Sequence, residues 1–530
     1  MRIALKLTAL TFFCLCLLVA GNVNAAPRYW IYLKGKDTKG YKPEKNLSPA
    51  TLSHRKQAGK ALDQFSDVPL NVAYLQQLQS KGIKTRVASK WLNAVSAELS
   101  NEQLQQLDEM PFVLRAEPFR VHFKPASFKN EEAAEKASPG YSPPLKQINA
   151  EYFDRHDLDG SGIVVGLIDA GFRDADKQQA LRHVFMRNQV KATLDKVDSN
   201  HNNNFFRNAS GSVDTHGSTV LRHVAGYDST THIKSGCATG ATFYLARTDD
   251  AKHEFRGEED YWLAAMEWMD SAGVRIINTS LGYALGFDKP IENYRPDQMD
   301  GGSSAVVRAA NMAVTDKDIL VIVSAGNDGG NNDWRYYIST PADGKEVLSI
   351  GATLDPPYPR ADYSGIGPAA LPWLKPNLSC YSLNGTSFSA PVISGFAACV
   401  LQANPALTTL QLRDVLEKSA NLYPYGNNYI GYGWPDAEKA VKLAKKPDAE
   451  LDGAEEIKAN NLKKEIDGSY TIKIKQGSER EAELFHKKDK RNVVSQEEVK
   501  LDGKYIHFTR PDGVDRTTVV DGLKVYEVIW

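Results

Sequence analysis

The chain has 530 residues, 42% of them hydrophobic and 24% charged, and its 64 basic and 65 acidic residues leave a formal net charge of −1. This is the composition of a globular protein with room for two or three domains. The near-zero net charge gives no reason to expect nucleic acid or a strongly charged partner.

The N-terminus predicts a secretory signal peptide. Arg2 and Lys6 precede an apolar stretch at 7–20, and residues 23–25 offer a small-residue cleavage site. The apolar stretch is shorter than the roughly 20 residues that span a bilayer. We therefore expect residues 1–25 to be removed. The mature protein would be secreted, either outside the cell or into a periplasm, without a permanent membrane anchor.

Residues 26–126 predict a small α/β domain. Residues 29–33 are typical of a strand, Ser100 to Gln103 form a capping box, and residues 112–123 alternate as a strand does. Residues 127–143 have no apolar periodicity and are typical of a solvated linker that is open to proteolysis.

A continuous apolar run at 162–168 predicts a central parallel strand buried on both faces. Asp169 ends this run, and ligands gather at the carboxyl ends of strands in open α/β sheets. Farther along, His216 is followed by Gly217 and by apolar residues at helical spacing, which places its imidazole at the start of a buried helix. A plain strand-end carboxylate is the alternative interpretation of Asp169.

Two later apolar strands run into short polar motifs. The first, at 275–277, leads into Asn-Thr-Ser-Leu-Gly at 278–282, and the second, at 320–323, leads into Ser-Ala-Gly-Asn at 324–327. A buried core strand is the alternative interpretation of the first. A turn asparagine at a strand end is the alternative for the second, since Asn327 stands before Asp-Gly.

The motif Gly385-Thr386-Ser387-Phe388-Ser389-Ala390-Pro391 opens an apolar run at 392–401 that predicts a buried helix. A serine at such a junction lies at a helix N-terminus, where free backbone N–H groups can stabilise an oxyanion. An ordinary serine N-cap is the alternative interpretation.

Together these motifs resemble the catalytic blocks of subtilisin-like serine proteases, the subtilases, over about 300 residues and in the family's order Asp, His, Asn, Ser. Ala170 and Ser218 are mild departures from the family pattern. The resemblance implies a three-layer α/β fold with a mostly parallel central sheet at 144–445. It also implies that the small α/β domain before that body is a propeptide. Independently of the resemblance, strand-like alternation and Asp-Gly turns predict a small antiparallel β domain at 450–530.

The resemblance implies a Ser-His-Asp triad of Ser387, His216 and Asp169, with Asn327 as oxyanion donor. Asp214 competes with Asp169 for the role of orienting acid. We favour Asp169, because a residue two positions from His216 rarely folds back onto its ring. Peptide substrates would pair with main-chain groups of Ser280, Leu281, Gly282, Ser324, Ala325 and Gly326.

The resemblance further implies a secreted endopeptidase made as a precursor, with polypeptide substrates and its own propeptide as an intramolecular inhibitor. No cofactor is required for this chemistry. One alternative is a catalytically inert subtilase scaffold that only binds. Another is a different acyl hydrolase, which the sequence disfavours because Ser389 occupies the last position of the Gly-x-Ser-x-Gly elbow.

Three further features stay open in the sequence. The polar loop with Asp195, Asp198, Asn200, Asn202 and Asn204 partly matches a calcium loop, so a structural calcium ion is an alternative. Cys237, Cys380 and Cys399 remain after the signal peptide, and a Cys237–Cys380 disulfide is compatible with an exported protein. The strand-like C-terminal domain resembles sorting domains of exported proteases from gliding bacteria, and a stabilising appendage is the alternative.

Overall fold

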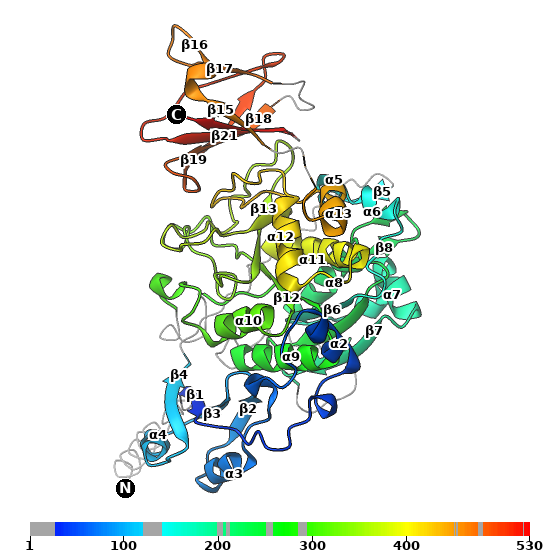
Figure 1. Ribbon diagram of the computed structural model, residues 1–530, viewed down its shortest axis with the longest axis vertical. Coiled ribbons are helices and arrows are strands. Elements are labelled where there is room, and N and C mark those ends of the chain that lie inside the picture. The colour runs from blue at the N-terminus through cyan, green and yellow to red at the C-terminus, as the bar shows by residue number, and fades with distance from the viewer. Residues whose placement is uncertain are drawn as a thin grey trace, which may run out of the picture.

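The computed structural model describes residues 27–119, 140–198, 205–207, 212–250, 258–284, 294–449, 451, 454–474, 481–522 and 524–530. The chain forms three successive bodies along the long axis of the molecule (Figure 1). The predicted signal peptide and most of the predicted linker lie outside the described residues.

The first body is an antiparallel sheet in the order β2-β3-β1-β4 with helices on one side. Its core is a separate apolar cluster that includes Ile31, Leu78, Val95 and Leu107. The elements are β1 (Arg28–Leu33), α2 (Pro49–Gln57), α3 (Val72–Ser80), β2 (Thr85–Ser89), β3 (Ala94–Glu98), α4 (Asn101–Asp108) and β4 (Val113–Pro118).

The structure adds two features to this first body that the sequence did not predict: the β2–β3 hairpin and a long excursion between β1 and α3. We call the excursion, residues 34–71, the arm; it carries α2. The predicted capping box is present, because the Ser100 and Gln103 side chains each bond the other's backbone N–H at the start of α4. The predicted last strand ends earlier than expected, at Pro118.

The second body is built on a seven-stranded parallel sheet. The strands, in spatial order, are β14 (Leu378–Tyr381), β13 (Leu348–Thr353), β12 (Leu320–Ser324), β11 (Ile276–Thr279), β6 (Val164–Asp169), β10 (Thr242–Arg247) and β7 (Val190–Asp195). Apolar residues on both faces of the central strands bury them completely, as the continuous apolar runs predict.

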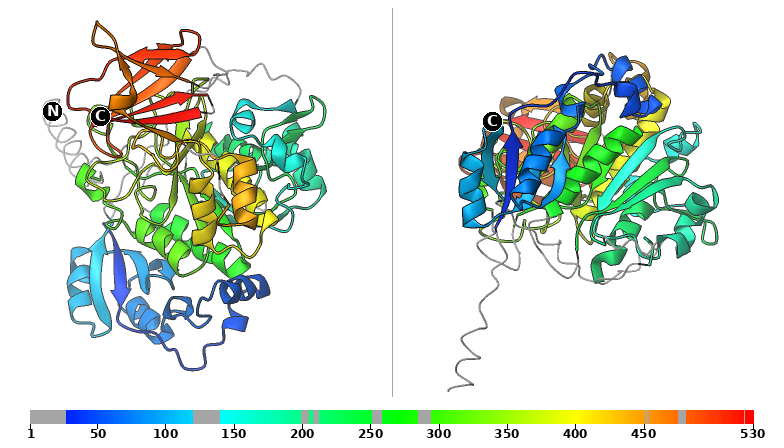
Figure 2. Two further views of the ribbon diagram at one scale, coloured as in Figure 1. Left: turned by 45° about the horizontal axis from the view of Figure 1, so that its top comes forward. Right: turned by 90° about the horizontal axis from the view of Figure 1, so that it is seen from below.

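Helices cover both faces of this sheet and make three layers (Figures 1 and 2). One apolar cluster contains α8, α11, α12 and α13, and the other contains α9 and α10. The helices are α5 (Pro143–Gln147), α6 (Glu151–Asp154), α7 (Arg182–Met186), α8 (His216–Ala225), α9 (Glu258–Ala272), α10 (Ala305–Thr315), α11 (Thr386–Ala403), α12 (Thr409–Lys418) and α13 (Ala437–Lys445).

Helix α11 is long and apolar enough to cross a membrane, but 83% of that stretch is buried inside the protein. It is therefore the central helix of the second body, with Phe396 and Cys399 fully buried.

The second body begins earlier than predicted. Strand β5 (Gly140–Tyr141) pairs with β9 (Ile233–Lys234), which also pairs with β8 (Tyr227–Asp228). Ser142 then stands at the N-cap position of α5, where its side chain makes no cap hydrogen bond. Residues 140–143 thus belong to the folded body and not to the linker, because their backbone groups pair with a distant strand that sequence periodicity does not reveal.

The third body holds two small sheets, ordered β15-β22-β21-β18-β19 and β16-β17-β20. All pairs are antiparallel as predicted except β15 with β22, which run parallel. The strands are β15 (Glu455–Lys458), β16 (Lys463–Lys464), β17 (Tyr470–Lys473), β18 (Glu481–Lys487), β19 (Val493–Lys500), β20 (Tyr505–Phe508), β21 (Arg516–Asp521) and β22 (Lys524–Ile529).

Candidate active site

Asp169 and His216 come together at the carboxyl end of the sheet. Asp169 is the last residue of β6 and His216 the first of α8, and the His216 Nδ1 atom lies 2.6 Å from Asp169 Oδ1. The same carboxylate oxygen accepts the backbone N–H of Ala170 at 2.8 Å. Both side chains are buried. The carboxylate therefore fixes the orientation of the imidazole, and Nε2, the second ring nitrogen, points away from Asp169.

Close packing explains the glycine after His216. A Cβ atom on Gly217 would lie 2.6 Å from the carbonyl oxygen of Gly171 and 3.0 Å from Asp169 Cβ. The start of α8 can approach the end of β6 only because this side chain is absent. The glycine therefore helps to set the distance between the carboxylate and the imidazole.

Asp214 has a different partner. Its Oδ1 atom accepts from Arg247 Nη2 at 3.2 Å, in a setting where both side chains are buried. Asp214 belongs to a short 3-10 turn that precedes α8. Of the two competing carboxylates, Asp169 is thus the one hydrogen-bonded to the His216 ring.

Ser387 is the second residue of α11. Gly385, just before the helix, has φ +128°, a conformation that side chains rarely adopt. The Ser387 Oγ atom donates to the carbonyl oxygen of Ser280 at 3.3 Å, and Ser280 Oγ donates to the Ser387 carbonyl at 2.8 Å. These two bonds hold the start of α11 against the end of β11.

The N-termini of α8 and α11 adjoin each other, which places His216 next to the Ser387 segment. The ring of Phe388 lies 5.4 Å from the His216 ring and 5.3 Å from the His223 ring, centroid to centroid. Burial lowers the pKa of His223 to about 4, so this ring stays neutral at ordinary pH. His223 thus packs on Phe388 as a neutral aromatic ring.

Asn327 is directed at the same helix start. Its Oδ1 atom accepts from both the backbone N–H and the Oγ1 hydroxyl of Thr386, each at 2.9 Å. A Cβ atom on Gly385 would lie 3.1 Å from Asn327 Nδ2. Because Thr386 binds the oxygen, the amide NH₂ is the group that can donate to a ligand.

The predicted substrate segments flank this start of α11. Ser280 bonds Ser387, and Gly326 N–H donates to Thr386 Oγ1 at 3.2 Å. Ala325 N–H already donates to Ile350 within the sheet. The remaining members of the predicted set, Leu281, Gly282 and Ser324, adjoin them on the same two strand ends.

Sequence reasoning missed Asp249. It follows β10, whose last residue pairs with Asp169 on β6, and Thr248 N–H donates to the Asp169 carbonyl at 3.1 Å. Burial raises the pKa of Asp249 to about 7, and the nearby charge of Asp169 acts in the same direction. The available signal was a carboxylate two residues beyond a strand, close to the pattern that identified Asp169.

The metal and disulfide questions have partial answers. No group of three or more His, Cys, Asp or Glu side chains within the described ranges is placed to hold a metal ion. Asn200, Asn202 and Asn204 of the polar loop lie outside those ranges, and Asp195 Oδ1 accepts the amides of Val197 and Asp198. The cysteines Cys237, Cys380 and Cys399 are all buried as free thiols, so the disulfide is not formed.

Comparison with known proteins identifies the family. The model of the subtilase family matches residues 160–433, just over half of the chain. The chain belongs to the subtilase family. A model of the Bacteroidota peptidase S8 propeptide domain matches residues 28–138, which contain the whole first body. The protein is therefore a subtilisin-like serine endopeptidase with a propeptide domain.

Two curated proteins that match the chain are subtilisins from Bacillus species. Subtilisin DY from Bacillus licheniformis is 28% identical over 313 residues, covering 57% of this chain and 98% of its own length. Subtilisin NAT from Bacillus subtilis subsp. natto is 25% identical over 374 residues, covering 69% and 85%. Among solved structures, MycP1 from the ESX-1 type VII secretion system matches with 20% identity and a TM-score of 0.43, covering 61% of this chain and 90% of that chain.

Proposed function

We propose that this subtilase hydrolyses peptide bonds through Ser387, His216 and Asp169. The supporting observation is the 2.6 Å bond between His216 Nδ1 and Asp169, because it holds the imidazole in the tautomer that leaves Nε2 as the base. Ser387 stands at the adjoining helix start, one residue before the Phe388 ring that contacts His216.

In the proposed reaction, His216 Nε2 takes the Ser387 Oγ proton while Oγ attacks the scissile carbonyl carbon. The protonated ring then gives this proton to the leaving amine, and the C–N bond breaks to form an acyl-enzyme. A water molecule, deprotonated by the same nitrogen, hydrolyses the ester and restores Ser387. Asp169 stays ionised and stabilises the imidazolium. These steps use only groups of the chain and water.

Asn327 and the N-terminus of α11 would stabilise the negative oxygen of the tetrahedral intermediate. The Asn327 NH₂ group is left to donate because Thr386 occupies Oδ1, and the first N–H groups of α11 point in the direction of the helix N-terminus. In subtilisin, loss of one such donor lowers kcat by about 10²–10³-fold, and we expect an effect of this order for Asn327.

Three further parts of the proposal concern substrate, maturation and location. An extended polypeptide would pair with main-chain groups at Ser280–Gly282 and Ser324–Gly326. The propeptide would inhibit the enzyme until the linker is cut, and the N-terminal segment would direct export. A structural calcium ion in the loop around Asp195 is a fourth part of the proposal.

The competing function is a catalytically inert scaffold that only binds. A measurement of peptide hydrolysis distinguishes it from the proposed endopeptidase.

Reaction with a fluorophosphonate probe and hydrolysis of a peptide substrate test the proposal. We expect Ser387→Ala and His216→Ala to abolish turnover, with unchanged melting temperatures. Asn327→Ala should lower kcat while KM changes little. Exposed Ser303 provides the matched control, and Ser303→Ala should behave as wild type. A folded wild-type enzyme that neither reacts with the probe nor cleaves peptides would support the inert scaffold instead.

A further inference from the structure

The arm leaves the propeptide sheet and contacts the second body beside the surface that the sheet itself contacts. In Figure 2 the dark blue arm passes close to the green helices of the second body. The sheet binds α9 one turn earlier, because Glu267 accepts from Ser89 Oγ at 2.6 Å and from two amides of the β2–β3 turn, and Lys90 Nζ donates to Ser271 Oγ at 2.9 Å. The propeptide therefore contacts adjoining parts of α9 with two different segments, the β2–β3 hairpin and the arm.

At the arm, polar groups of the propeptide meet the C-terminal ends of α9 and α10. The last carbonyl groups of a helix have no partner within the helix. Here the arm supplies donors to four of them. The bonds are Ser48 N–H to Ser271 O at 2.9 Å, Thr51 Oγ1 to Asp270 O at 2.7 Å, Gln64 Nε2 to Asp316 O at 2.8 Å, and Lys60 Nζ to Thr315 O.

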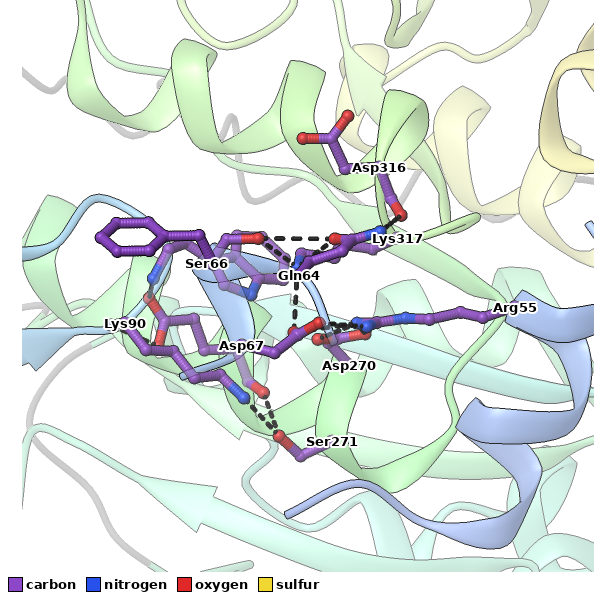
Figure 3. A network of polar contacts seen from close by, with 12 residues as sticks. Arg55, Gln64, Ser66, Asp67, Lys90, Asp270, Ser271, Asp316 and Lys317 are labelled. Carbon is purple, nitrogen blue, oxygen red and sulfur yellow. Dashed lines mark hydrogen bonds and ion pairs between the residues drawn. The ribbon is translucent and has the colours of Figure 1, made fainter. Parts of the chain in front are cut away.

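A chain of four alternating charges lies beneath these bonds, in the order Asp270, Arg55, Asp67, Lys317 (Figure 3). Arg55 Nη2 donates to both Asp270 oxygens at 2.6 and 2.7 Å, and Nη1 donates to Asp67 at 2.6 Å. Lys317 Nζ donates to Asp67 at 2.9 Å. All four side chains have 0% exposure. Two charges come from the arm and two from the enzyme body, so the network forms only when the two are together.

The end of α9 is shaped to receive the arm. Gly273 follows the helix with φ +95°, and a Cβ atom there would lie 2.8 Å from Ala50 Cβ of α2. Both the conformation and the space require glycine. The end of α9 thus has the shape that α2 of the arm requires. This end of α9 leads into the start of β11, whereas Asp169 of the proposed triad lies at the carboxyl end of β6.

We propose that the arm is a second anchor, separate from the substrate groove, that keeps the cleaved propeptide on the enzyme and sets the rate of its release. Release would leave Asp270 and Lys317 without their arm partners, and disruption of a buried ion network is strongly unfavourable. Two anchors on one domain also act together, because the release of one leaves the other bound. This inference rests on the proposed autoinhibition and adds a step between cleavage and activity.

The test uses the full chain with Ser387→Ala and a recognition site for an added site-specific protease within residues 127–138. After the linker is cut, size-exclusion chromatography follows how fast the propeptide leaves. We expect slow release from the parent protein and release at least about tenfold faster from Arg55→Met and from Asp270→Asn. The double variant should release about as fast as either single variant, because both substitutions remove the same contact.

Glu98→Gln is the matched control, since it removes an exposed ion pair with Arg28 on the propeptide sheet and should not change release. Melting curves of the uncut proteins test whether each variant folds. The double variant is a second check on folding, because it removes both charges of the Arg55–Asp270 pair and leaves neither of them unpaired. Equal release from all variants, or effects of the two single variants that multiply in the double variant, would overturn the proposal. Because the assay needs no catalysis, its outcome is independent of whether the triad assignment holds.

Discussion

At the scale of residues, two buried carboxylates near His216 have different bonding partners. Asp169 contacts the imidazole at 2.6 Å, whereas Asp214 pairs with the buried Arg247. The first contact controls a tautomer and the second neutralises a buried cation. Their substitutions should therefore affect different measurable quantities.

We expect Asp169→Asn to lower kcat by about 10⁴-fold with little change in melting temperature, because an amide favours the wrong imidazole tautomer. Asp214→Asn should instead destabilise the fold by about 1–3 kcal/mol, because it removes one of the two carboxylates, Asp214 and Asp195, that pair with Arg247, and the folded fraction should keep its turnover. Steady-state kinetics and thermal unfolding measure both effects, with the exposed Asp333→Asn as control. The reverse pattern would exchange the two roles.

At the scale of elements, strand β18 carries a carboxylate inside the third body. Glu483 is 1% exposed, and burial raises its pKa to about 8. Glu498 lies opposite it on β19 and acts in the same direction. The folded protein thus keeps this carboxyl protonated at pH values where the unfolded chain ionises it, so folding stability falls as pH rises from the ordinary Glu value toward 8.

Glu483→Gln should remove this loss. We expect the variant to unfold at nearly the wild-type temperature at pH 4.5 and to be more stable at pH 8, by roughly 3–5 kcal/mol. Chemical unfolding at both pH values measures the difference. The exposed Glu455→Gln on β15 should show no such pH-dependent gain. A constant difference at both pH values would contradict the raised pKa.

At the scale of the whole molecule, the third body shares the core of the second. Four buried residues of the third body, Phe485, Val493, Val520 and Val525, belong to the apolar cluster around α11. Asn428 N–H donates to the Arg491 carbonyl, and Val493 N–H donates to Asn428 Oδ1, each at 2.9 Å. These contacts favour the interpretation of a stabilising part over that of a loosely attached sorting domain.

Removal of residues 450–530 should therefore lower the melting temperature of the enzyme and promote aggregation, because it exposes apolar surface of the second body. Phe485→Ala in the full chain is the milder form, with an expected loss of about 3–5 kcal/mol. Differential scanning calorimetry and peptide hydrolysis measure both. A truncated enzyme with unchanged stability and activity would show that the third body is an independent appendage.

The sequence by itself determined those features that depend on local pattern. Continuous apolar runs predicted the central strands, and Asp169, His216, Asn327 and Ser387 stand at strand ends and helix starts as their motifs predict. Polar motifs at the ends of parallel strands necessarily gather at one edge of the sheet. That geometric rule made it predictable that these side chains gather at one edge of the sheet.

Only the tertiary structure decided what depends on contacts between distant segments. The sequence already favoured Asp169 over Asp214, but only the structure gives the bonding partner of each carboxylate, and the pairing of Gly140 with β9 moved the domain boundary. The arm has little apolar periodicity, and it is held instead by buried ion pairs. Its charged residues Arg55 and Asp67 pair with residues of the second body more than 200 positions away. The sequence around a charged residue does not show which distant charge it pairs with, so only the tertiary structure identifies these ion pairs.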